Sequence, residues 1–241
     1  MMTDVRGIWA FLEASPLLWL AVTLIAYQIA YAIYLRAGRN PLLNPVLVSI
    51  ALIITVLLGT RTPYPTYFDG ARLVHFLIGP ATVAMAVPLY THSERLKHML
   101  LPLAGALLVG SATAIISAVA IGWTFGASPD TLLSLAPKST TMPIAMGITE
   151  KIGGSPSLTS LMVTLTGIAG AIMARGLLAL VRIDDVATRG FAVGVTAHAI
   201  GTAYTFQLGE VAVAFAALGM GLNGILTTIL VPVLMRLLMS H

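Results

Sequence analysis

The chain has 241 residues, of which 58% are hydrophobic and 9% are charged, and its formal net charge is +4. Soluble domains carry about 25% charged residues, so this composition excludes an ordinary soluble domain and predicts a membrane protein. Most of the few basic residues lie in or next to connecting segments, which is typical of membrane loops and not of a nucleic-acid surface. The chain contains no cysteine, which excludes disulfides and cysteine-based metal sites or nucleophiles.

Eight segments approach the ~20 mostly apolar residues that a helix needs to cross a bilayer. They are expected near 17–35, 42–59, 71–90, 99–126, 130–150, 156–181, 187–208 and 210–238. Clusters of proline, glycine and charge separate them, and no linker is long enough to divide two domains. The pattern therefore predicts one all-α membrane domain over residues 1–241, a polytopic bundle of about seven or eight spans.

The segment 130–150 is a poor ordinary helix, because Lys138 lies in it between Pro137 and Pro143. Each proline removes a helix hydrogen bond, and a charge at bilayer depth costs at least ~2.5–3.5 kcal/mol. Irregular backbone is tolerated there only inside protein or beside a wet cavity. The segment is therefore predicted to be a broken or re-entrant helix that binds a small anion.

A second segment, 187–208, carries His198 and Thr202 among small residues, and Gly201 weakens its helix. Interrupted helices at corresponding places in two halves of a chain indicate a transporter site. A weak internal similarity, in which the tract from Pro80 aligns with the tract from Pro137, makes inverted repeats a candidate arrangement.

The basic residues favour a re-entrant segment at 130–150 and an external N-terminus. In that arrangement one face would hold Arg36, Arg39, Arg95, Lys97, Arg182, Arg189 and Arg236. The other face would hold Arg6, Arg61, Arg72 and Lys151. The excess on the first face has the direction that the positive-inside rule expects for a cytoplasmic side.

Several tracts resemble the LrgB/CidB family, in order and from about residue 20 to the C-terminus. They are Asn44-Pro45, Gly79-Pro80-Ala81, Pro88-Leu89-Tyr90, the runs 126–129 and 135–146, Arg189-Gly190 and the run 197–203. The resemblance implies a multi-pass protein of the bacterial inner membrane, often working with an LrgA- or CidA-like membrane partner. It also implies a homo-oligomer, and this chain resembles only the LrgB part.

The family has been described in terms of murein hydrolase regulation and cell lysis. A plant relative, the plastidal glycolate/glycerate translocator, moves short hydroxy acids, and bacterial relatives are linked to pyruvate uptake. The resemblance therefore implies transport of small monocarboxylates, with lysis control as the older description.

Lys138 is the first candidate for binding a carboxylate, because charge-assisted hydrogen bonds are roughly twice as strong as neutral ones. Ser139, Thr140 and Thr141 follow it and could hydrogen-bond the same ligand. The alternatives are a lysine that reaches the membrane interface or one that pairs with a buried acid.

His198 is predicted to complete the site with Thr202, as a proton carrier for coupled transport or as a neutral donor to the ligand. The alternative is a packed histidine bonded to a neighbouring helix. Asn44 either lines the cavity or caps a helix. Asn223 either lines the cavity or bonds between helices, and the second interpretation is favoured.

Motifs for ATP hydrolysis, metal binding and serine nucleophiles are absent, so neither an enzyme nor a cofactor is expected. The leading hypothesis is a secondary transporter of glycolate, glycerate, lactate or pyruvate, coupled to a proton because an inside-negative potential opposes uptake of an anion alone. The alternative is a holin-like or antiholin-like regulator of murein hydrolase export and cell lysis, acting with an LrgA- or CidA-type partner.

Overall fold

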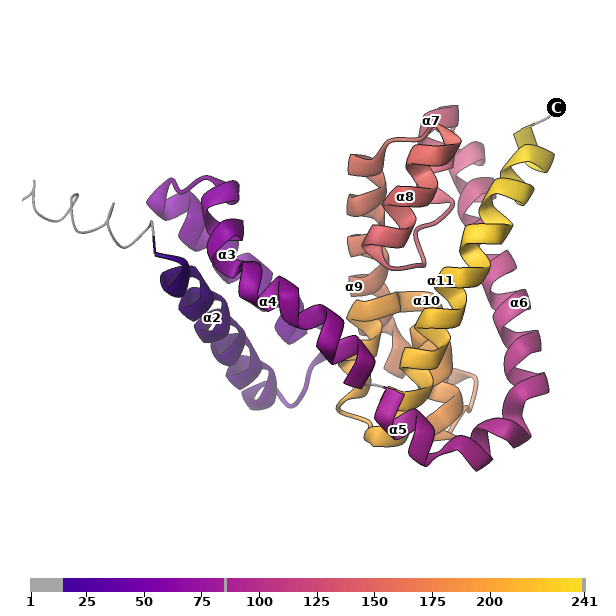
Figure 1. The fold of residues 1–241 in the computed structure, drawn as a ribbon, viewed down its shortest axis with the longest axis horizontal. Helices are drawn as coiled ribbons and strands as arrows, with labels where there is room; N and C mark the ends of the chain where they lie inside the picture. The colour runs from indigo at the N-terminus through magenta and orange to yellow at the C-terminus, as the bar shows by residue number, and fades with distance from the viewer. Residues whose placement is uncertain (1–14, 85, 240–241) are drawn as a thin grey trace, which may run out of the picture. The chain divides into compact units, whose positions relative to one another are not determined.

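The computed structural model describes residues 15–84 and 86–239, and every regular element in these ranges is helical (Figure 1). The prediction of an all-α fold is confirmed. The chain divides into two compact units, Met1–Val83 and Ala84–His241, which are considered separately. The prediction of a single domain over 1–241 is not tested by this division. Arg6, which enters the expected charge asymmetry, lies outside the described residues.

From residue 15 onward, the described part of the first unit contains three helices and one short 3-10 turn. They are α2 (Pro16–Arg36), η1 (Pro41–Leu43), α3 (Pro45–Thr60) and α4 (Tyr64–Ala84). Asn44 caps α3, since its Oδ1 accepts a hydrogen bond from the Val46 amide at 2.8 Å. The buried Trp19 of α2 packs on Gly70 of α4, where an added Cβ would lie 2.7 Å from the tryptophan side chain.

The second unit contains seven helices among its described residues. They are α5 (Ala86–Thr91), α6 (Ser93–Thr124), α7 (Pro129–Leu135), α8 (Met142–Ile152), α9 (Pro156–Leu180), α10 (Val186–Thr205) and α11 (Glu210–Met239). Ser128, Ser155 and Asp185 precede α7, α9 and α10, and each side chain accepts a hydrogen bond from a first-turn amide. These caps set where the three helices begin.

Four described helices are long and apolar enough to cross a membrane. They are Leu17–Arg36, Ser93–Thr124, Pro156–Leu180 and Glu210–Leu238. Helix α3 is apolar but shorter, and the segment expected at 71–90 is divided between α4 and α5, with Met85 outside the described residues. A multi-pass membrane protein is thus supported, whereas the expected count of seven or eight spans is not confirmed.

Buried apolar side chains of the second unit form two clusters, the α7-side cluster and the α10-side cluster. The α7-side cluster contains Ile115, Val119, Leu132, Ala136, Ile148, Val231 and Met235. The α10-side cluster contains Leu103, Ala187, Phe191, Val195, Ala214 and Phe215. In both α6 and α11 the earlier residues join the α10-side cluster and the later ones join the α7-side cluster, so these two helices run parallel.

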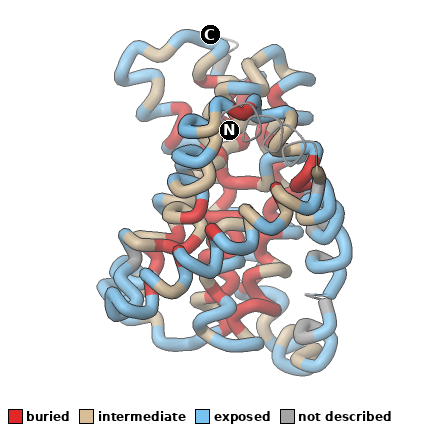
Figure 2. Tube along the Cα trace, turned by 90° about the vertical axis from the view of Figure 1, so that its left-hand side faces the viewer, coloured by how far each residue is buried: buried red, intermediate tan, exposed pale blue. Residues whose placement is uncertain are grey.

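A buried polar layer separates the two clusters. Ser111 of α6 and Asn223 of α11 are 2% and 1% exposed, and Ser111 Oγ donates to Asn223 Oδ1 at 2.7 Å. Asn223 lies eight residues from both Phe215 and Val231, or about 12 Å along the helix in each direction. The polar groups therefore lie midway along the unit, within the buried interior that Figure 2 shows in red.

The first half of α10 packs unusually close to α11. A Cβ added at Gly190 would lie 2.2 Å from the Ala212 carbonyl oxygen, and one at Gly194 would lie 2.0 Å from that of Ala216. From the first contact to the second, the position advances by four residues in α10 and by four residues in α11, so the two helices are parallel here. Small residues at this spacing let helix backbones approach closely, as in many membrane helix pairs.

Candidate functional site

The first break in the helices separates α7 from α8, at residues 136–141. The Lys138 amide donates to the Leu135 carbonyl, and the Thr140 amide donates to the Pro137 carbonyl, each at 3.1 Å. These are tight turns and not α-helical bonds. The predicted interruption around Lys138 is therefore present.

Helices α7 and α8 form a hairpin, because the chain returns to the level it left. Thr159 Oγ1, near the start of α9, donates to the Ser134 carbonyl of α7 at 3.0 Å. The same hydroxyl is 2.9 Å from Thr149 Oγ1 of α8. The residues between Ser134 and Thr149 thus run out and back, and their turn lies away from the start of α9. We call residues 136–141 the first tip.

The second break lies inside α10, at His198, whose φ of 42° and ψ of −137° are not helical. Gly201 lies back against the first half of the helix, since an added Cβ there would be 2.5 Å from Ala197 Cβ and 2.9 Å from Val193 Cγ1. In a continuous helix, residues four apart have Cβ atoms about 5–6 Å apart. The chain therefore reverses at His198, which we call the second tip.

The two tips approach from opposite ends of the unit and contact α11 at neighbouring levels. Asn223 Nδ2 donates to the Ser139 carbonyl of the first tip at 2.9 Å. Thr202 Oγ1, one turn after the second tip, is 3.9 Å from Met220 Sδ. Met220 and Asn223 are separated by about 4.5 Å along α11. The first hairpin extends from the α7-side cluster and the second from the α10-side cluster.

This reversal corrects the expected charge grouping. Arg236 was expected on the same face as Arg182 and Arg189, opposite Lys151. In the structure its neighbour Met235 packs in the α7-side cluster with Ile148 of α8, so Arg236 and Lys151 lie at the same end of the second unit. The expectation failed because 187–208 was counted as a full crossing, whereas its helix turns back at His198.

Lys138 lies in the first tip and is half-buried. Its Nζ donates to Ser139 Oγ at 3.4 Å, and none of the ion pairs among the described residues includes it. Ser139, next to Lys138, contacts Asn223, and Thr202, four residues after His198, contacts Met220. The two segments predicted to form the site, 60 positions apart (198 − 138 = 60), therefore lie at neighbouring levels of α11.

His198 is 3% exposed, and its Nε2 lies 2.9 Å from the Val163 carbonyl oxygen of α9. A carbonyl oxygen only accepts hydrogen bonds, so this nitrogen carries the proton. Gly167 makes room for the ring, because a Cβ there would lie 2.6 Å from His198 Cε1. His198 therefore packs against α9 and bonds to it, which is the alternative role considered for this residue in the sequence. The other ring nitrogen, Nδ1, carries no proton and can accept a hydrogen bond.

Thr140 is the least satisfied polar residue of the first tip. It is 1% exposed, and its Oγ1 is the one buried side-chain polar atom without a hydrogen-bond partner among the described residues. Gly224 of α11 faces it, with an added Cβ placed 3.4 Å from that oxygen. A buried hydroxyl without a partner costs roughly 1–3 kcal/mol, so this atom is available for a ligand.

The remaining predicted residues have different surroundings. Ser139 is 7% exposed, and its hydroxyl accepts from Lys138. Thr141 is the N-cap residue of α8, but its side chain makes no capping hydrogen bond, which leaves first-turn amides of that helix without this partner. Thr202 Oγ1 donates to the His198 carbonyl at 2.8 Å within its own helix. Asn44 lies in the first unit as a cap, so its role toward a ligand stays a prediction.

Sequence reasoning singled out Asn223, which holds the first tip, but not the groups that Asn223 contacts. Asn223 Oδ1 accepts from Ser111, and also from Thr227 at 3.2 Å, while its amide holds Ser139. The interpretation of Asn223 as a bond between helices is confirmed. A polar residue deep in the last apolar segment was the available signal, but its partners come from two distant segments.

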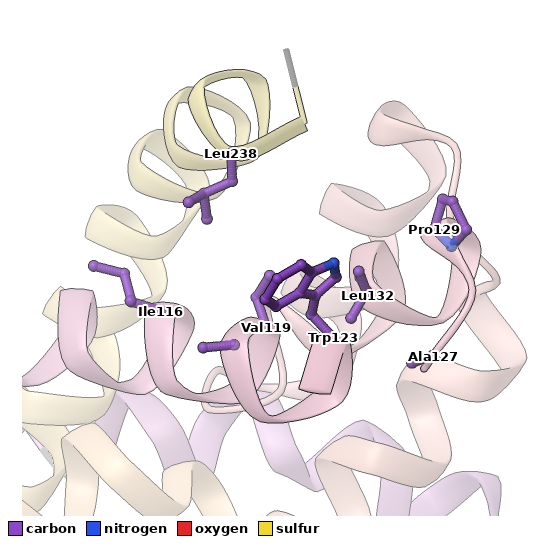
Figure 3. A pocket seen from close by; sticks show the side chains of 8 residues that line it. Ile116, Val119, Trp123, Ala127, Pro129, Leu132 and Leu238 are labelled. Carbon is purple, nitrogen blue, oxygen red and sulfur yellow. The ribbon is translucent and has the colours of Figure 1, made fainter. Parts of the chain in front are cut away.

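A separate pocket of about 570 Å³ lies at the α7 end of the second unit (Figure 3). Its walls come from α6, α7 and α11, with Ile116, Trp123, Leu132 and Leu238 among them. These side chains offer hydrocarbon and one indole, and none is charged. The pocket therefore lacks the chemistry to bind a small anion and is distinct from the tips.

Comparison with known proteins identifies relatives along nearly the whole chain. The profile of the LrgB-like family matches residues 23–237. An uncharacterized Bacillus subtilis protein, YxaC, is 34% identical over 216 residues, which cover 90% of this chain and 94% of that protein. The holin-like protein CidB of Staphylococcus epidermidis is 30% identical over 223 residues, with 92% and 97% covered. The antiholin-like protein LrgB of Bacillus cereus is 29% identical over 221 residues, with 92% and 96% covered. No solved structure matches.

Proposed function

This chain belongs to the LrgB-like family, and we propose that it is a secondary carrier of small monocarboxylates in the bacterial inner membrane. The observation that carries the proposal is that two opposed hairpin tips contact α11 at neighbouring levels, and that one of them holds Lys138, a lysine without a carboxylate partner among the described residues. Discontinuous helices that meet between two ends of a bundle are typical of secondary transporters.

The first tip offers one cation and several hydrogen-bond donors to an anion. Lys138 supplies the charge, Thr140 has an unused hydroxyl, and the N-terminus of α8 adds a positive dipole end. Ser139 and Thr141 contribute further hydroxyls. One cation matches one carboxylate, and hydroxyls next to it match a hydroxy or keto group. Glycolate, glycerate, lactate and pyruvate are the acids proposed, on the basis of the family resemblance.

Within the membrane, both hairpins are proposed to be re-entrant. Helices α6, α9 and α11 then cross the bilayer, and these are the helices of the second unit with the length and hydropathy to do so. The tips would lie near the bilayer centre, where irregular backbone requires a protein interior or a cavity. Relative movement of helices around the tips would give alternating access. Neither an enzymatic reaction, a cofactor nor a nucleic-acid partner forms part of this proposal.

Uptake into proteoliposomes tests the proposal. Radiolabelled glycolate, lactate and pyruvate should enter vesicles containing the wild type with saturation, and Lys138→Ala should reduce uptake at least tenfold. Lys151→Ala is the matched control, because this lysine is exposed at the end of α8, and its uptake should be that of the wild type. Saturable uptake by Lys138→Ala at the wild-type rate would contradict the proposal.

A second candidate function is favoured by the relatives' names. CidB of S. epidermidis is called holin-like and LrgB of B. cereus antiholin-like, and these names favour a role in lysis control over carboxylate transport. In that role the chain would assemble with copies of itself or with an LrgA- or CidA-type partner. The exposed apolar faces, such as Leu101 at 85% and Phe125 at 87%, suit lipid or such a partner.

Leakage of a trapped dye separates the two functions. A holin-like assembly should release a fluorescent dye from vesicles, without saturation by acids and without dependence on Lys138. A carrier should retain the dye while exchanging labelled for unlabelled acid. Coexpression with an LrgA-type partner should change dye release only if the second function is correct.

A further inference from the structure

We infer that Lys138 carries the coupling proton of the proposed transport, loading it together with the acid anion, and that His198 is a positioning residue for the second tip. This inference rests on the proposed carrier function. It differs from the sequence-based expectation, in which His198 carried the proton. The distinction follows from what each of the two side chains already contacts.

His198 already makes a hydrogen bond that holds the second tip against α9. Its Nε2–H donates to the Val163 carbonyl at 2.9 Å, and the absence of a Cβ at Gly167 lets the ring lie against α9. The residue also turns the chain, with a φ of 42°. Because the Val163 carbonyl already holds Nε2–H and the ring is 3% exposed, only Nδ1 could take up a proton, and no described side chain is shown to hydrogen-bond that atom.

Lys138, unlike His198, is not held by a strong hydrogen bond. Its Nζ donates to one hydroxyl, Ser139 Oγ at 3.4 Å, and no described carboxylate pairs with it. Holding an ammonium partly out of water without a counter-charge is costly, and a lysine amine can avoid this cost by giving up a proton. A bound carboxylate removes this cost, because it supplies the missing counter-charge.

The other titratable side chains of the surrounding described helices lie toward helix ends. In α6 the group of charges is at the start, from Glu94 to His98, and in α9 Arg175 is near the end. In α8, Glu150 and Lys151 lie in the last turn, and in α11, Glu210 and Arg236 lie near opposite ends. Asp130 of α7 is exposed in the first turn. Tyr204 lies in the last turn of α10, and Tyr90 of α5 is 82% exposed. Of the charged residues and histidines in the described parts of these helices, Lys138 and His198 are those at the tips.

The proton then moves with the acid in a balanced cycle. At the side where acid is present, the neutral Lys138 amine accepts a proton from hydronium: an O–H bond of hydronium breaks, an N–H bond forms, water is left, and the resulting ammonium binds the carboxylate. On the other side the carboxylate leaves and the N–H bond breaks, with its electron pair remaining on Nζ and the proton passing to water. Both the empty and the loaded site are neutral, so one proton accompanies one monocarboxylate and no net charge crosses the membrane.

The test measures proton entry and acid entry together, in vesicles with a trapped pH indicator, labelled lactate and a potassium diffusion potential set with valinomycin. For the wild type we expect one proton per lactate and uptake that does not change with the potential. Uptake that depends on the potential would overturn the inference without any variant. Saturable exchange by the wild type tests the carrier function itself, so the two failures give different results.

Two variants assign the proton. His198→Gln keeps an amide donor for the Val163 carbonyl, and its proton-to-lactate ratio should remain one even if its rate falls. Lys138→Arg keeps a cation that does not lose its proton, so the number of protons entering per lactate exchanged should fall at least tenfold, whatever exchange rate the variant has. A His198→Gln protein that exchanges lactate without moving protons, or a Lys138→Arg protein with normal proton coupling, would overturn the assignment.

Discussion

The side-chain amide of Asn223 donates to the Ser139 carbonyl oxygen across 2.9 Å, joining α11 to the first tip between residues 84 positions apart. The oxygen of the same amide accepts from Ser111 and Thr227. All of these groups are buried. One amide therefore gives the carbonyl of a broken helix its hydrogen-bond partner and links that segment to α6 and α11. These bonds hold the segment around Lys138 in place.

Asn223→Leu should lower both stability and transport. The change leaves the Ser139 carbonyl and two hydroxyls without partners, and hydrogen bonds between membrane helices contribute about 0.6 kcal/mol each on average. We expect a loss of about 1–2 kcal/mol, measured by thermal unfolding in detergent, and a larger fractional loss of lactate uptake. Thr228→Val is the control, since that hydroxyl bonds only within its own helix, to the Gly224 carbonyl, and it should leave both quantities nearly unchanged.

Thr140→Val separates a ligand-binding hydroxyl from a structural one. Since Thr140 Oγ1 is buried without a partner, replacing it by a methyl group of the same shape should leave stability equal or raise it by up to about 1 kcal/mol. The KM for lactate should nevertheless increase several-fold. Thr149→Val gives the opposite pattern, because its hydroxyl pairs with Thr159: stability falls and the KM is retained. An unchanged KM in Thr140→Val would exclude the hydroxyl from the binding site.

Gly194→Ala tests the close packing of α10 on α11. A Cβ there would lie 2.0 Å from the Ala216 carbonyl oxygen, so the helices must separate, and overpacking of this kind costs typically 1–3 kcal/mol. We expect a corresponding decrease in unfolding temperature. Gly221→Ala, on α11 with no atom within 4 Å of the added Cβ, should instead be neutral or slightly stabilising. Equal effects of the two substitutions would contradict the packing described.

The carboxyl group of Asp185, in the loop before α10, makes the stability of the protein depend on pH in the acid range. Partial burial raises the pKa of this carboxyl, but hydrogen bonds from Thr188 and the Arg95 guanidinium together hold the pKa below its ordinary value. A lowered folded-state pKa stabilises the protein above the unfolded pKa of about 3.9 and loses that contribution as the pH falls through the folded value. The contribution is small, because both side chains are more than 40% exposed.

Asp185→Asn should therefore weaken the decrease of unfolding temperature below about pH 4, while retaining a residue that caps helices well. Asp185→Ala should also lose the cap, at a cost of about 1 kcal/mol at neutral pH. The exposed neighbour Asp184, which is 3.6 Å from Arg189, provides the control as Asp184→Asn. An acid response identical in all three variants would show that Asp185 does not contribute to it.

Much of the candidate site was predictable from short stretches of sequence. Pro137, Lys138 and Pro143 are neighbours in the chain, so a broken helix with an intramembrane cation follows from local rules on proline and on buried charge. The weak helix around His198 and Gly201 was predictable for the same reason. In contrast, Ser111, Thr227 and Val163 have ordinary sequence contexts, and their contribution depends on which helices pack together.

The sequence by itself determined that this chain is an all-α membrane protein of the LrgB-like family with two interrupted helices, because composition and helix-breaking residues act over a few neighbouring positions. Only the tertiary structure decided that α10 reverses at His198, that Arg236 lies at the end of the unit that holds Lys151, and that Asn223 holds the first tip. These features arise from contacts between residues far apart in the chain. A single glycine or amide at such a contact determines whether two helices meet, and its neighbours in sequence do not reveal the partner.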